Sequence, residues 1–160
     1  MDIVPLLKSL SEAHGVSGYE HLVRQLVRQE FGRHADECRV DTLGNVIACR
    51  HGTGSDPRPS IMLAAHMDEI GLIVSQLDEG FIRFQQVGGY DSRVLPGQEV
   101  LVHGRRGLPG IIGARPPHVL SPSERDKPIP SDELLIDVGL EAARLREMVR
   151  VGDLITMDAG

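Results

Sequence analysis

Residues 61–69 read IMLAAHMDE, and this stretch decides how the fold is interpreted. An apolar run over 61–65 is followed at once by the mostly polar segment HMDE. A short, continuous apolar run is typical of a strand that is buried on both faces of a sheet. In layered α/β folds, ligands bind beyond the carboxyl ends of such strands. The stretch therefore predicts a buried strand over 61–65 with a functional site at its end.

His66 and Asp68 are the candidate site residues, because alternation along a strand directs both side chains to the same side. A histidine at a strand end can bind a metal ion through one ring nitrogen. A nearby carboxylate then holds the other nitrogen and fixes the tautomer. The alternative is an ordinary hydrogen-bonded histidine at a strand terminus, since an isolated H-x-D pattern is common by chance. A zinc site needs at least three protein ligands, so the other ligands must come from elsewhere.

The residues before this run predict two helices and a hairpin. Apolar side chains recur with helical spacing over 19–33, which predicts an amphipathic helix. Ser17 and Glu20 have the spacing of a capping box at the start of that helix. A shorter helix is expected over 5–14, and residues 37–50 predict two strands joined by a turn.

The register of that hairpin decides where the two cysteines lie. If its loop consists of Leu43 and Gly44, Cys38 lies directly opposite Cys49, and a cross-strand disulfide is geometrically allowed. Reduced thiols are the expectation for a cytosolic protein. The sequence leaves the redox state of Cys38 and Cys49 open.

The pattern changes to all-β after Ile70. The turn signals LDEG at 77–80 and GRRG at 104–107 each lie between strand-like segments, which is typical of hairpins. A proline-rich loop is expected over 116–130. Many short strands joined by turns predict a small barrel, with a domain boundary between residues 68 and 70.

The composition excludes several classes of function. With 17 basic and 23 acidic residues the net charge is −6, which a nucleic-acid-binding protein would rarely carry. Aromatic residues make up 3 % with no Trp, so aromatic platforms for base stacking are not expected. No apolar run approaches the roughly 20 residues that span a bilayer, and no signal-peptide pattern is found. We therefore expect a cytoplasmic protein without nucleic-acid or membrane partners.

Longer strings carry a family resemblance. AAHMDEIGLIV at 64–74, VGGYDSRVLPGQEVLVHGRRGLPGIIGARPPHVL at 87–120 and LLIDVGLEAA at 134–143 resemble metallopeptidase family 42. The segments HGVSGYE at 14–20 and DTLGNVIA at 41–48 are similar to the family's N-terminal region. The family includes glutamyl aminopeptidases and tetrahedral TET-type aminopeptidases, and some members are labelled endoglucanases.

The resemblance implies a fold and a division into domains. Residues 1–69 would be the N-terminal part of an α/β metallopeptidase catalytic domain, with helices and a mixed sheet. Residues 70–160 would be a β-rich, PDZ-like or barrel-shaped dimerisation domain and the start of the return to the catalytic domain. Members are homo-oligomers, from dimers to dodecamers, which would assemble through the β-rich domain.

The resemblance also implies a chemistry. Members hold two divalent metal ions, usually zinc or cobalt, and remove N-terminal residues from short peptides. His66 matches the family's first metal ligand, and Asp68 matches the carboxylate that orients this histidine and supports catalysis. The further ligands and the general-base glutamate lie beyond this chain, so we expect an N-terminal portion that supplies one metal ligand and is inactive alone.

Two other interpretations remain open. The chain could be a non-catalytic module that mediates oligomerisation or binds peptides along an exposed strand edge. It could also be part of a related di-zinc deacylase or carboxypeptidase, which uses a similar H-x-D at a strand end. The substrate side-chain preference, the identity of the metal and the oligomeric state are not determined by the sequence.

Overall fold

The computed structural model describes residues 3–119, 121, 127 and 129–157. Its internal contacts divide the chain into two compact units, Met1–Glu69 and Ile70–Gly160. The expected proline-rich loop over 116–130 lies partly outside the described residues. Among the described residues, none of the helices is long and apolar enough to cross a membrane.

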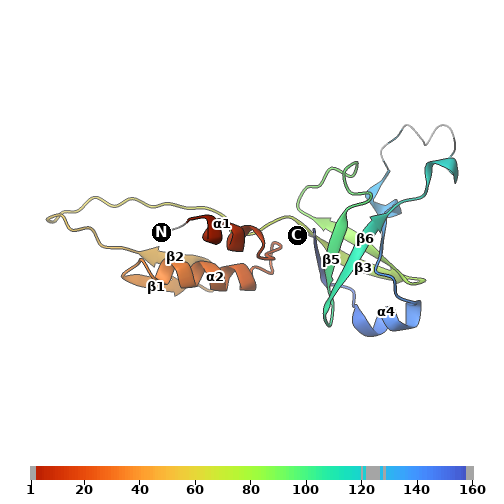
Figure 1. The fold of residues 1–160 in the computed structure, drawn as a ribbon. Helices are drawn as coiled ribbons and strands as arrows, with labels where there is room; N and C mark the ends of the chain where they lie inside the picture. Colours follow the sequence, from red (N-terminus) through yellow and green to blue (C-terminus); the bar gives the residue numbers. More distant parts are fainter. Residues whose placement is uncertain (1–2, 120, 122–126, 128, 158–160) are drawn as a thin grey trace. The chain divides into compact units, whose positions relative to one another are not determined.

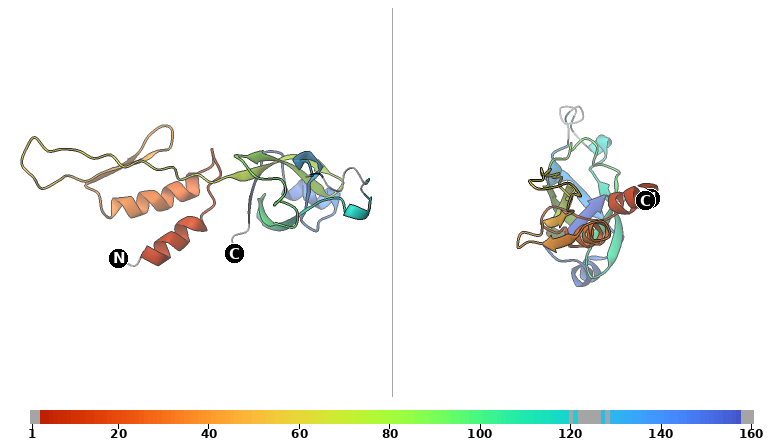
Figure 2. Two further views of the ribbon diagram at one scale, coloured as in Figure 1. Left: turned by 90° about the horizontal axis from the view of Figure 1, so that it is seen from above. Right: turned by 90° about the vertical axis from the view of Figure 1, so that its left-hand side faces the viewer.

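The first unit combines two helices with a small sheet (Figures 1 and 2). Its helix α2 packs against both strands of an antiparallel pair, and Val23 is the buried residue of that helix. The expected mixed sheet is wrong for the described residues of this unit, whose sheet has two antiparallel strands. In chain order the elements are α1 (Ile3–Ser11), α2 (His21–Gly32), β1 (Glu37–Val40) and β2 (Val46–Cys49).

The predicted register of the β1–β2 hairpin is wrong by one residue. Cys38 pairs with Ala48, and Glu37 pairs with Cys49. The Asp41 carboxylate accepts hydrogen bonds from the amides of Leu43 and Asn45 at 3.0 and 2.9 Å, and the Asp41 amide donates to the Asn45 carbonyl at 3.1 Å. These bonds close a three-residue loop that ends at Gly44, whose φ of 94° favours glycine.

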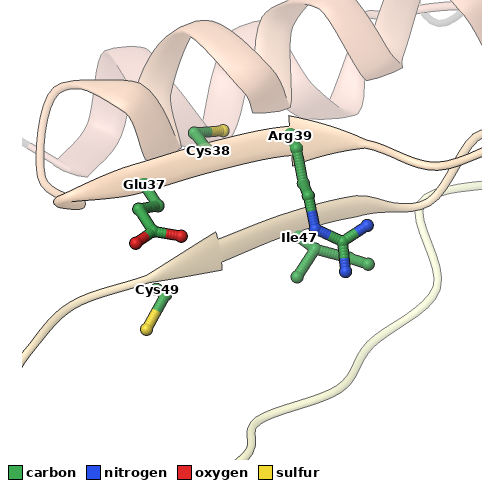
Figure 3. Close-up of a pocket in the computed structure, with 5 residues that line it drawn as sticks. All are labelled: Glu37, Cys38, Arg39, Ile47 and Cys49. Atoms are coloured by element: carbon green, nitrogen blue, oxygen red, sulfur yellow. The ribbon is translucent and has the colours of Figure 1, made fainter.

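This register places the two thiols on opposite faces of the sheet. Because side chains alternate along a strand, a shift by one residue reverses the face of every side chain. In Figure 3 the Cys38 thiol is directed towards the helix and the Cys49 thiol away from it. The Cys38 thiol also lies 3.8 Å from the Arg28 carbonyl of α2. Both cysteines are free.

The predicted buried strand over 61–65 does not form in this structure. These residues form no strand, and the side chains of Ile61, Met62 and Leu63 are 90, 89 and 92 % exposed. A strand buried on both faces needs a hydrogen-bonded neighbour on each side. Among the described residues, neither β1 nor β2 pairs with this segment, and its side chains face solvent.

The second unit is a closed six-stranded barrel, as the turn-rich pattern predicts. Its strands follow the order β3-β4-β7-β6-β5-β8, and β3 also pairs with β8 to close the ring. The 3-10 turns η1 (Pro117–Val119) and η2 (Ser131–Glu133) belong to this unit, and the helix α4 (Ala142–Met148) packs against β3. The strands are β3 (Gly71–Asp78), β4 (Phe81–Val87), β5 (Glu99–His103), β6 (Gly107–Gly113), β7 (Leu135–Asp137) and β8 (Leu154–Met157).

Closure of the barrel corrects the expectation of a PDZ-like domain, which the described part of this chain does not contain. PDZ domains bind peptides by adding a strand to an exposed sheet edge. In this barrel each strand pairs on both sides, which leaves few such edges, and the weakest pairing is that of β4 with β7 at Ile82. Peptide binding along a free barrel edge is therefore not supported by this topology.

The barrel interior holds a continuous apolar core. Apolar side chains from the strands and from α4 fill it, and most are less than 2 % exposed. Alternation along β6 separates the two neighbouring isoleucines: Ile112 is 1 % exposed and Ile111 is 48 % exposed. Burial of such side chains provides the main favourable term for folding of this unit.

Truncation of these two isoleucines tests the barrel packing. We expect Ile112→Ala to lower the free energy of unfolding by about 2–5 kcal/mol, because it leaves a cavity in the core. The matched variant Ile111→Ala should cost less than about 1 kcal/mol, because its side chain faces solvent. Urea unfolding followed by circular dichroism measures both values, and equal losses would contradict the assigned inward and outward faces.

Oxidation tests the hairpin register. The wild-type chain should form no intramolecular Cys38–Cys49 disulfide under mild oxidant, because the two thiols lie on opposite faces. In the double variant Ala48→Cys/Cys49→Ser, the new thiol lies directly opposite Cys38, and an intramolecular disulfide should form. Mass spectrometry of tryptic peptides distinguishes the two results. A disulfide in the wild type but not in the double variant would support the register predicted from the sequence instead.

Candidate functional site

The structure brings the two predicted site residues together at the end of the first unit. His66 and Asp68 follow the segment 61–65 and precede the first barrel strand. The His66 Nδ1 atom lies 3.0 Å from the Asp68 Oδ1 atom and 3.0 Å from the Asp68 carbonyl oxygen. The side chain of His66 is 84 % exposed, and that of Asp68 is 36 % exposed.

The contacts of Nδ1 define the orientation of the imidazole. Both nearby groups, a carboxylate oxygen and a backbone carbonyl oxygen, are acceptors, so Nδ1 carries the hydrogen. Nε2 of the neutral ring then has a free lone pair. In proteins, a histidine that binds a metal usually donates its other ring N–H to a carboxylate or carbonyl in this way. The arrangement fits a metal ligand that binds through Nε2.

Ser17 is a contact of this site that the sequence analysis missed. Its hydroxyl donates a hydrogen bond to Asp68 Oδ2, the carboxylate oxygen that does not face His66. The Ser17 hydroxyl and, to a smaller extent, His66 hold the pKa of the Asp68 carboxyl below its ordinary value, against the opposing effect of burial. Asp68 is therefore an ionised acceptor with both oxygens engaged.

The predicted capping box accounts for this omission. The helix α2 begins at His21, and its N-cap residue Glu20 makes no side-chain capping bond. Glu20 instead accepts a hydrogen bond from the Gly18 amide at 2.6 Å. The S-x-x-E spacing is therefore present without the capping box, because the N-cap of α2 is Glu20 and not Ser17. The Ser17 hydroxyl bonds to Asp68. A long-range contact of this kind leaves no local sequence signal.

A short backbone bridge fixes this contact in place. Val16 pairs in parallel with Glu69, the Glu69 amide donates to the Gly15 carbonyl at 2.8 Å, and the Ser17 amide donates to the Glu69 carbonyl at 3.3 Å. The Glu69 carboxylate accepts a bond from the Gly15 amide at 3.0 Å. Val16 is 1 % exposed, so the bridge is anchored by a buried side chain.

The residues present fit one ligand of a metal site and not a complete site. In the described ranges, no group of three His, Cys, Asp or Glu side chains lies close enough together to hold an ion. The oriented imidazole of His66 is one suitable donor, and structural or catalytic zinc needs at least three from the protein. A metal site that includes His66 therefore needs ligands beyond these residues.

A hollow on the β1–β2 sheet has a different character. It measures about 380 Å³ and is lined by Glu37, Cys38, Arg39, Ile47 and Cys49 (Figure 3). These side chains come from two short strands and include neither of the predicted site residues. The paired His66 and Asp68 remain the stronger candidate, because their contacts are specific to a chemical role.

A family model, curated proteins and solved structures match this chain. The family model for M42 glutamyl aminopeptidases matches residues 44–160. A lysyl aminopeptidase of Pyrococcus furiosus is 38 % identical over 155 residues, which cover 93 % of this chain and 44 % of that protein. Among solved structures, a TET aminopeptidase from a marine sediment archaeon of the Thaumarchaeota is 38 % identical with a TM-score of 0.88, covering 98 % of this chain and 45 % of that one.

A second solved structure extends the comparison. The Pyrococcus horikoshii TET1 peptidase, described as able to assemble into a tetrahedron or a large octahedral shell, is 37 % identical with a TM-score of 0.81. The match covers 98 % of this chain and 47 % of that one. The chain thus spans less than half the length of these relatives. Since the family model matches most of the sequence, the chain belongs to the M42 glutamyl aminopeptidase family.

Proposed function

We propose that the complete protein is a metal-dependent aminopeptidase that removes N-terminal residues from short peptides. The observation that carries this proposal is the contact between His66 Nδ1 and the Asp68 carboxylate, 3.0 Å apart, which leaves Nε2 for a metal ion. Membership of the M42 family supports the reaction class. In this proposal His66 is a metal ligand and Asp68 is the residue that positions it.

The cofactor of the complete protein would be two divalent ions, zinc or cobalt. When bound, such ions polarise a peptide carbonyl and make a water molecule more acidic at neutral pH. His66 would bind through Nε2, and Asp68 would hold the imidazole in the matching tautomer and stabilise its orientation. The remaining ligands would come from residues beyond those described, since one histidine cannot hold two ions.

The exposed run at 61–65 supports a larger catalytic domain. Three adjacent large apolar side chains, Ile61, Met62 and Leu63, are each about 90 % exposed. A soluble domain rarely leaves such a run open, and pairing with further strands would bury it. We propose that this segment is a sheet strand in the complete protein and that the 160-residue chain alone does not hydrolyse peptides.

The assembly and location of the complete protein are part of the proposal. A homo-oligomer is supported by the relative from Pyrococcus horikoshii, which is described as assembling into closed shells. We propose short peptides as substrates and a cytoplasmic location. The side-chain preference at the peptide N-terminus would be set by residues outside this chain.

Substitution of the proposed ligand tests the function. In the complete protein, His66→Ala should lower the zinc or cobalt content and reduce kcat/KM on short peptides to the background rate, because a ligand to the metal is lost. Asp68→Asn should weaken metal binding or activity about 10–100-fold, because the partner that orients His66 is lost. Peptide cleavage assays and elemental analysis measure both effects.

His51→Ala is the matched control for these variants. His51 belongs to the same unit, and its side chain is 60 % exposed. Its Nε2 atom lies 3.8 Å from the Oε1 atom of Glu37. This variant should retain its metal content and activity. Full metal content and full activity in His66→Ala would refute the proposal, as would cleavage of N-acetylated peptides at the same rate as free ones.

A further inference from the structure

We propose that Ser17 is a positioning residue of this site, which holds the Asp68 carboxylate so that Asp68 keeps His66 in the tautomer with Nε2 free for the metal. This inference rests on the proposed function and adds a residue to the site. It connects the segment at 14–20 to the metal ligand, although the two are about fifty positions apart in the chain.

The first argument is that each carboxylate oxygen of Asp68 has a different hydrogen-bond donor. Oδ1 accepts from His66 Nδ1 at 3.0 Å, and Oδ2 accepts from the Ser17 hydroxyl. A carboxylate that is about one-third exposed can rotate about its last bond, since that torsion has a broad energy minimum. A donor on Oδ2 removes this freedom and keeps Oδ1 directed at the imidazole.

The absence of a competing role for the Ser17 hydroxyl is the second argument. Ser17 lies three residues before Glu20, the N-cap residue of α2, so its hydroxyl is not placed to cap the helix. Its hydrogen bond goes to Asp68, which is consistent with a role in the site and not in the helix.

The rigidity of both backbones is the third argument. The parallel bridge between Val16 and Glu69 lies directly beside the Ser17–Asp68 pair, so both side chains project from segments that are bonded to each other. Gly15 allows this segment to lie close to α2, because a Cβ atom there would lie 2.7 Å from Val23 Cγ1. The backbone bridge therefore holds the Ser17 hydroxyl close to the Asp68 carboxylate.

The bridge also links the site to the core of the first unit. Val16 and Val23 are both buried, and Val23 belongs to α2. Residues 61–65, on the other side of His66, have exposed side chains. In the described residues of this unit, the bridge and the Ser17 bond are thus the contacts that fix the position of Asp68.

A purely structural role for Ser17 would predict a different result from a positioning role. If its hydroxyl only joined two segments, its loss would change the free energy of unfolding and leave the tautomer of the His66 imidazole unchanged. If it positions Asp68, its loss must change the tautomer of His66 and the affinity of the site for metal. The state of the imidazole is therefore the discriminating readout.

The first measurement uses the 160-residue chain without metal, labelled with ¹⁵N, at a pH where His66 is neutral. Long-range proton–nitrogen correlation spectra should show His66 with its hydrogen on Nδ1. In Ser17→Ala the Nε2–H tautomer should gain population, as it should in Asp68→Asn. Ser17→Thr should restore the wild-type spectrum, because it keeps the hydroxyl and residue 17 is exposed.

Ser9→Ala is the matched control. The Ser9 hydroxyl donates to the Pro5 carbonyl at 2.9 Å within α1, so this variant removes one exposed serine hydroxyl whose bond, unlike that of Ser17, is local. It should leave the His66 spectrum unchanged. Circular dichroism of all variants should match the wild type, since residue 17 is exposed.

The second measurement uses the complete protein and titrates it with zinc. Ser17→Ala should weaken zinc binding about tenfold, at the lower end of the 10–100-fold effect of partners that orient metal ligands. Ser17→Thr should restore the affinity. An unchanged tautomer and unchanged zinc affinity in Ser17→Ala, with weaker binding in His66→Ala, would overturn the role of Ser17 and leave the proposed function intact. Equal zinc binding by the wild type and His66→Ala would overturn the proposed function itself.

Discussion

The hydrogen-bonded chain from Ser17 through Asp68 to His66 is the interaction on which the account of this protein depends. Each oxygen of the Asp68 carboxylate has its own donor, and the imidazole is left with one nitrogen for a metal ion. These hydrogen bonds form only if the backbones that carry Ser17 and Asp68 are held close together. The bridge between Val16 and Glu69 does this, because it joins the segment before α2 to the residues directly after His66. The geometry of the site is thus set by a backbone contact between distant parts of the sequence.

The two units satisfy their backbone hydrogen bonds in different ways. In the barrel, every strand has neighbours on both sides, and a core of apolar side chains fills the interior. In the first unit, the two-stranded sheet is covered by α2, while the run at 61–65 pairs with no strand among the described residues and its side chains are exposed. The unit that holds the candidate ligand therefore contains three adjacent apolar side chains that are about 90 % exposed.

The sequence predicted the features that depend on local patterns. Helical spacing located α2, and turn signals located the hairpins of the barrel. His66 does contact Asp68, although the strand from which their common side was predicted does not form. The errors arose where a distant or competing contact decides the outcome. Asp41 closes a longer loop than a two-residue turn and shifts the cysteines to opposite faces, and Ser17 bonds to Asp68 instead of capping a helix. The run at 61–65 has the composition of a buried strand, but its side chains are exposed. The composition of a segment does not show whether neighbouring strands are present to pair with it.

A zinc-bound crystal structure of the complete protein, with anomalous diffraction at the zinc edge, tests the central claim most directly. The account predicts an anomalous peak about 2.0–2.1 Å from His66 Nε2, the usual zinc–histidine distance. It also predicts that Asp68 remains hydrogen-bonded to His66 Nδ1 and to the Ser17 hydroxyl. A peak at Nδ1, or a zinc site that does not include His66, would contradict the account.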